Sequence, residues 1–178
     1  MQMIRKYILT ILLCNIAITI TTNIFNINIV SAAPGVVTCA MTTINNMNFG
    51  RYYPTSSNFS PVTSTITVTC NNGMSSTQTV GFTLCFSTGS SNNYAQRTML
   101  SGSQNLVYNF YSTNGYTQIL GDGNDSTVYF FIYYNLAASA SRSDTLPLYG
   151  KIPVQSSARV GSYIDTINAT LSYGNQNP

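Results

Sequence analysis

The chain has 178 residues, enough for one domain with a buried core once a targeting segment is removed. Charged residues make up only 6% of the chain, where roughly 25% is usual, and the formal net charge is +3, so the surface is neutral and rich in hydroxyl and amide groups. His and Glu are absent, and neither a catalytic motif nor a basic cluster is present, which argues against an enzyme and against a nucleic-acid-binding protein.

The N-terminus is typical of a secretory signal peptide. Arg5 and Lys6 precede an apolar run at residues 7–20, in the order of the basic and hydrophobic regions of such a peptide. Asparagines interrupt the apolar character beyond this run, which argues against a membrane-spanning helix. We therefore expect an exported protein that is not an integral membrane protein.

The cleavage site is open to two interpretations. The small residues Ser31 and Ala32 suit a signal peptidase, and a cut after them gives a signal peptide at 1–32 and a domain at 33–178. A cut near residue 22 is the alternative, because apolar and polar residues alternate at 25–29 as they do in a short strand. We favour the later cut on the small-residue rule alone.

Three cysteines follow the signal peptide: Cys39, Cys70 and Cys85. In an exported protein two of them are expected to pair, and we favour Cys39 with Cys70, because the first opens one strand region and the second closes the next. This bond would close a loop of about 32 residues. Cys85 is then expected to be a partly buried free thiol, with a bond to Cys39 or to another molecule as the alternatives.

From Cys39 onward, strand-like runs alternate with turn-rich clusters, and no stretch has a helical period. The period-2 pattern predicts strands near 39–49, 62–70, 78–86, 105–112, 116–120, 126–135, 145–153 and 163–173. Short strands at this spacing predict a single antiparallel β-sandwich domain.

The last of these strands has nothing after it to pair with. Its apolar residues Ile167, Ala169, Leu171 and Tyr173 alternate with polar ones, as in a strand with one buried face, and only five residues follow. We therefore expect another chain to supply a missing strand beside it.

Metal and cofactor chemistry has little support in the sequence. GDGND at 121–125 is like part of a calcium loop, but the Glu that such a loop needs is absent, so we expect a turn there and neither a metal nor a cofactor. Asp165 is expected to make a structural hydrogen bond or a salt bridge, with Arg97 or Arg159 as a candidate partner.

Seven short motifs occur in a distinctive order along the chain. They are NMNFG (46–50), TITVTC (65–70), RTM (97–99), LVYNFYST (106–113), GDG (121–123), LYGKIP (148–153) and VGSYIDTINATLSY (160–173). Together they resemble the spore coat protein U domain, the subunit domain of archaic, Csu-type chaperone–usher pili, over residues 39–173.

The resemblance implies an incomplete immunoglobulin-like antiparallel β-sandwich that lacks its final strand. In this family a periplasmic chaperone lends a strand, and the N-terminal extension of the next subunit replaces it at an outer-membrane usher. Chaperone, usher and neighbouring pilus subunits are therefore the implied partners. The donor-strand acceptor groove would run along Ile167, Ala169, Leu171 and Tyr173, unless these four residues are ordinary sandwich core.

The aromatic run at 128–136 is apolar on both faces. Tyr129, Phe131 and Tyr133 share one face, and we favour a central strand covered on that side by a loop or a neighbouring subunit. The alternative is an exposed patch that adheres to hydrophobic surfaces, as adhesive subunits of the family do.

We therefore expect a non-enzymatic structural subunit of a surface pilus or coat, exported through the periplasm to the cell surface. An adhesive subunit at the fibre end and a secreted coat protein that does not polymerise are the alternatives. The mature N-terminus decides among them, because a chain starting at Ala33 is too short ahead of Cys39 to donate a strand, whereas an earlier cut exposes Phe25, Ile27 and Ile29 as donor residues.

Overall fold

The computed structural model describes residues 25–31, 37–54, 56 and 58–174, with side chains from residue 37 onward. Its strands are β1 (Phe25–Ser31), β2 (Val37–Ile44), β3 (Ser60–Asn72), β4 (Gln78–Phe86), β5 (Arg97–Ser101), β6 (Gln104–Tyr111), β7 (Phe130–Leu136), β8 (Ser141–Ile152) and β9 (Ile167–Gly174). A short 3₁₀ turn, η2 (Gly89–Ser91), follows β4. The described part of the chain is thus all-β, as the sequence predicts.

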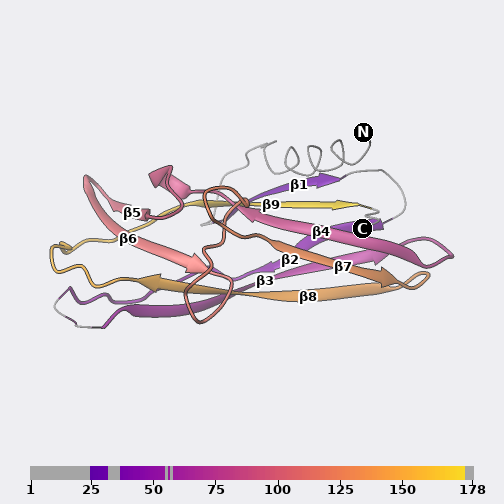
Figure 1. The fold of residues 1–178 in the computed structure, drawn as a ribbon, viewed down its shortest axis with the longest axis horizontal. Coiled ribbons are helices and arrows are strands. Elements are labelled where there is room, and N and C mark those ends of the chain that lie inside the picture. Colours follow the sequence, from indigo (N-terminus) through magenta and orange to yellow (C-terminus); the bar gives the residue numbers. More distant parts are fainter. Residues whose placement is uncertain (1–24, 32–36, 55, 57, 175–178) are drawn as a thin grey trace.

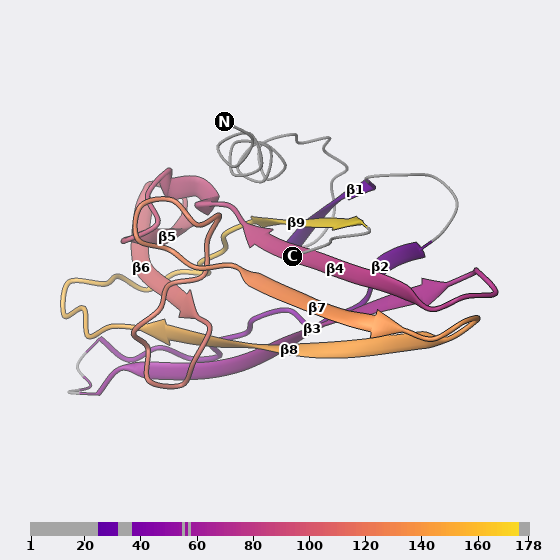
Figure 2. The same ribbon diagram turned by 45° about the vertical axis from the view of Figure 1, so that its right-hand side comes forward.

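Two sheets form the sandwich. One has the strand order β1-β9-β4-β7, and the other has the order β2-β3-β8-β6-β5. The strands run along the long axis of the molecule, and β9 lies between β1 and β4 in both views (Figures 1 and 2). Every pairing is antiparallel except that of β1 with β9.

Strand β3 shows how the sequence builds these layers. Ile66, Val68 and Cys70 are fully buried, and the threonines between them lie on the outer face. There Thr67 and Thr69 lie within hydrogen-bond distance of Thr145 and Ser143 of β8, at 3.0 and 2.8 Å between hydroxyl oxygens. Paired hydroxyls on the outer face explain how this sheet faces solvent with so few charges.

The core fills the space between the two sheets. Phe86 of β4 and Phe110 of β6 are 2% and 1% exposed and meet edge to face, with ring centroids 5.3 Å apart. Leu84, Leu148 and Leu171 belong to the same continuous apolar cluster. Because this cluster draws on both sheets, the strands form a single domain.

The strand predictions need several corrections. The strand predicted at 39–49 ends at Ile44, and those predicted from 126 and 163 begin at Phe130 and Ile167. Residues 116–120 form no strand, because only isolated bridges join Tyr111 to Ile119 and Leu120 to Val128. Strand β5 (Arg97–Ser101) was not predicted, since five residues around a buried arginine carry no alternating pattern. Strand β7 is an edge strand and not a central one.

Candidate functional site

Strand β9 forms the floor of the candidate site. Its apolar residues Ile167, Ala169, Leu171 and Tyr173 are buried, between 0% and 8% exposed. On one side β9 pairs antiparallel with β4, where Leu171 lies opposite Leu84. These are the four residues that the sequence places along an acceptor groove, and the structure puts all of them in the core beside the outer edge of β9.

That outer edge is paired with the chain's own N-terminal segment. Strand β1 lies along β9 in parallel, with Phe25 opposite Ile167 and Ser31 opposite Tyr173. The sequence leads us to expect an edge without a partner in the chain, and the structure instead pairs it with residues 25–31. A parallel strand differs from the antiparallel strand that would complete an immunoglobulin-like sandwich.

A large cavity lies where β9 begins. Its volume is about 930 Å³, and it extends between the segment at 46–54, which follows β2, and the segment at 159–165, which precedes β9. Most of its side chains are apolar, and they include Met47, Phe49, Met99, Leu106, Tyr163 and Ile167. Since Ile167 is also the first β9 residue that pairs with β1, the cavity lies beyond the end of that pairing.

Asp165 fixes the chain between the cavity and β9. Its carboxylate accepts hydrogen bonds from the Ser90 amide (2.9 Å), the Ser90 hydroxyl (2.6 Å), the Tyr108 hydroxyl (2.7 Å) and the Thr166 amide (2.9 Å). Burial, together with the charge of Asp165, raises the pKa of Tyr108. Gly89 has a φ of 67°, and a side chain there would overlap the carboxylate.

The expected structural hydrogen bond of Asp165 is therefore present, but its partners are Ser90, Thr166 and Tyr108. Within the described residues no ion pair joins Asp165 to Arg97 or to Arg159. The sequence could not identify these partners, because they come from a 3₁₀ turn and from a different strand.

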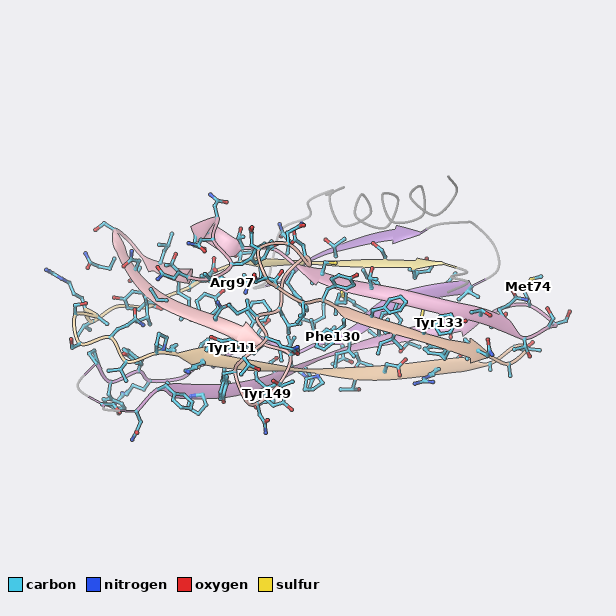
Figure 3. The ribbon with its side chains drawn as sticks, in the orientation of Figure 1. Met74, Arg97, Tyr111, Phe130, Tyr133 and Tyr149 are labelled. Atoms are coloured by element: carbon cyan, nitrogen blue, oxygen red, sulfur yellow. A yellow bond between two sulfur atoms is a disulfide. The ribbon has the colours of Figure 1, made fainter. Side chains whose placement is uncertain are left out.

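Arg97, labelled in Figure 3, is fully buried next to this site. Its guanidinium donates to the carbonyls of Ser87 (2.8 and 3.1 Å) and Leu120 (2.7 Å) and to the amide oxygen of Asn109 (2.6 Å). It also lies 4.2 Å from the ring centroid of Phe110. Burial lowers the pKa of Arg97 to about 10, so it remains charged at neutral pH. With four of its five N–H donors used in this way, Arg97 holds neighbouring segments together.

The cysteines agree with the sequence prediction in one case and not in the other. Cys39 and Cys70 form a disulfide across directly opposite residues of β2 and β3, with 4.0 Å between the Cα atoms. Cys85 is also disulfide-bonded in the full-length chain, which differs from the predicted free thiol.

The aromatic residues of the 128–136 run lie open to solvent. Tyr129, Phe131 and Tyr133 are 39%, 55% and 41% exposed, and Tyr133 is labelled on β7 in Figure 3. The predicted central position is wrong, because β7 is the edge of its sheet. Cover of this face by a neighbouring subunit stays a prediction.

The GDGND segment forms a turn, as predicted. The Asn124 amide donates to the Asp122 carboxylate (3.0 Å), the Thr127 amide donates to the Asn124 carbonyl (2.9 Å), and Gly123 has a φ of 92°. No group of three or more potential metal-ligating side chains occurs in the described part of the chain. None of the described helices is long and apolar enough to cross a membrane.

The cavity is the part of the site that sequence reasoning missed. The segment at 46–54 forms one wall. Residues 46–49 were predicted as the end of a strand at 39–49, but β2 ends at Ile44 and no strand follows it before β3. NMNFG stands out in the sequence only through the family resemblance, and its Met47 and Phe49 supply apolar lining.

Comparison with known proteins supports the same assignment. The model of the Spore Coat Protein U domain family matches residues 21–170. No curated protein matches the chain. The family is one of structural pilus and coat domains, and its members are exported surface proteins. Because the match covers most of the sequence, the chain belongs to the Spore Coat Protein U domain family.

Proposed function

We propose that this protein is a structural subunit of a surface pilus or coat, assembled by donor-strand complementation with a periplasmic chaperone and an outer-membrane usher. The observation that carries the proposal is the pairing of residues 25–31 with residues 167–173 of β9. This segment lies ahead of β2 and brings Phe25, Ile27 and Ile29 opposite the buried residues Ile167, Ala169 and Leu171. An edge that accepts such a segment in its own chain has the apolar floor and free backbone groups needed to accept it from a neighbour.

We propose further that the mature protein keeps this segment, which requires cleavage near residue 22 and not after Ala32. The family match begins at residue 21, so residues 25–31 fall within the family domain. Residues 25–31 pair with β9 as a strand, and a donor segment must be able to form such a pairing. The intact mass of the exported protein tests this point directly, since a start at Ala33 would remove the donor.

The acceptor groove can be tested by restoring the strand from outside. A chain that starts at Ala33 lacks β1, and we expect it to be unstable or self-associated when expressed alone. A synthetic peptide of residues 23–33, NIFNINIVSAA, should raise its melting temperature as the peptide concentration rises, because a ligand that binds only the folded state stabilises it.

The matched control is the same peptide with Ile27→Asp and Ile29→Asp, which keeps its length but cannot place apolar groups on β9. We expect no shift in melting temperature with the control peptide. A stable monomer that ignores both peptides would contradict the acceptor groove and with it donor-strand assembly.

A second candidate function is adhesion through the exposed face of β7. The exposure of Tyr129, Phe131 and Tyr133 favours it, because aromatic side chains at alternate positions of β7, and at the residue just before it, expose apolar surface in a segment without charged residues. The double variant Tyr129→Ser/Tyr133→Ser should reduce attachment to hydrophobic surfaces while assembly stays normal. Tyr53→Ser, at another exposed tyrosine (59%), is the control. Unchanged attachment of the double variant would exclude this role for the patch.

A further inference from the structure

The direction of β1 is constrained by its connection to β2. Only residues 32–36 separate Ser31 from Val37. The end of β1 and the start of β2 lie at the end of the molecule where β9 also finishes (Figures 1 and 2). With Ser31 opposite Tyr173, the short connection needs to cross only from one sheet to the other.

An antiparallel β1 would strain this connection to its limit. Ser31 would then lie near Ile167, about 20 Å further along β9 at 3.3 Å per residue, and about 10 Å from the opposite sheet. The resulting separation of about 22 Å equals the greatest reach of six fully extended Cα–Cα steps. The chain's own segment can therefore pair with β9 in parallel without strain, but not in the antiparallel direction.

A segment from a second copy has no such tether. It can run antiparallel to β9, which is the more stable direction of pairing and the one that completes an antiparallel sandwich. It can also continue past Ile167 over the apolar cavity, which the chain's own β1 leaves uncovered. The two modes of pairing therefore use the same edge but differ in direction and in how much of the site they fill.

We propose that the subunit first closes on itself, as a self-capped monomer in which residues 25–31 occupy their own β9 edge in parallel. In this state the donor segment and the acceptor edge are withheld together, so the monomer neither donates nor accepts a strand until the chaperone or a second copy displaces β1. Polymerisation requires the release of β1 and its replacement by the antiparallel segment of a second copy. This inference rests on the proposed function, since it describes how donor-strand assembly is held back.

Cysteine pairs can distinguish the two directions in the full exported chain. Phe25→Cys with Ile167→Cys places the new thiols directly opposite each other in the parallel register. Phe25→Cys with Tyr173→Cys places the two new thiols at opposite ends of the parallel pairing. These two thiols come together only when the segment pairs with β9 in the antiparallel direction. The native Cys39–Cys70 bond joins directly opposite residues of neighbouring strands, so this fold accepts such a link. Size-exclusion chromatography followed by peptide mass analysis of each fraction gives the bonds formed.

A self-capped monomer predicts a 25–167 bond within monomers, no 25–173 bond within monomers, and 25–173 bonds between chains in polymers. Polymers that form while monomers have no 25–167 bond would overturn the self-capped state and leave donor-strand assembly intact. A 25–167 bond in a protein that neither polymerises nor binds the donor peptide would overturn donor-strand assembly instead.

A longer connection provides a second test. Six Gly and Ser residues inserted between 32 and 36 lengthen the connection enough for β1 to pair with β9 of the same chain in the antiparallel direction. The chain could then complete its own sandwich. We expect a more heat-stable monomer and the loss of polymers. Undiminished polymerisation of this variant would contradict the control of direction by the short connection.

Discussion

Replacement of Arg97 by alanine should lower the free energy of unfolding by about 3 to 5 kcal/mol, the range for removing a large buried side chain. Two main-chain carbonyls and the amide oxygen of Asn109 would lose their donors, at about 1 to 3 kcal/mol for each group left unsatisfied. Relief of the burial cost, which is visible in the lowered pKa of Arg97, offsets part of this loss. Since whole domains are stable by only about 5 to 15 kcal/mol, the variant should be close to unfolding.

Urea unfolding of the purified proteins measures this loss as a change in midpoint at constant slope. Arg51→Ala, at an exposed arginine, is the matched control and should change stability by less than about 0.5 kcal/mol. Arg97→Lys should also be clearly destabilised, because a single ammonium cannot reach all three acceptors as the planar guanidinium does. If Arg97→Ala lost less than about 1 kcal/mol, the hydrogen bonds of Arg97 would not hold these segments together.

Removal of the Cys39–Cys70 bond is expected to have the next largest effect. The two cysteines are 31 residues apart in sequence, and in the chain-entropy model a loop of this size contributes about 3 to 4 kcal/mol. The variant Cys39→Ala/Cys70→Ala should therefore lose that amount, mainly because its unfolded chain gains freedom. Thermal and urea unfolding at equal protein concentration give the difference.

Thr42→Ala is the control for the same pair of strands, where the Thr42 and Thr69 hydroxyls lie 3.0 Å apart on the outer face. Its cost should stay below about 1 kcal/mol, as for an exposed hydrogen bond. Equal unfolding midpoints for the cysteine variant and the native protein would mean that packing of β2 on β3 alone determines the stability of this edge.

Alternation of apolar and polar residues predicted most of the sandwich. It placed Ile167, Ala169, Leu171 and Tyr173 on the inner face of the last strand, because a strand with one buried face has a period of two. The same rule failed at 116–120, where the chain forms isolated bridges only. It also failed at β5, whose most buried residue is the charged Arg97.

The candidate site was predictable only in part, for a physical reason. Periodicity identifies the buried apolar residues of β9, but it does not predict that Thr170 and Ser172 are buried too. It also does not record which segment pairs with the outer edge or in which direction. Pairing direction depends on the length of a connection and on where its ends lie in space, as for residues 32–36. The cavity depends on two irregular segments meeting, and irregular segments have no period to detect.

The Cys39–Cys70 bond has a mechanical consequence in a fibre of the proposed kind. Each subunit would be pulled through its N-terminal segment, and tension would enter the domain at Val37, where β2 begins. Cys39 is only two residues further along, so the pull passes into the long central strand β3 through a covalent link after very little of β2 can peel away. Hydrogen bonds between the donor and β9 should then yield before the subunit itself unravels.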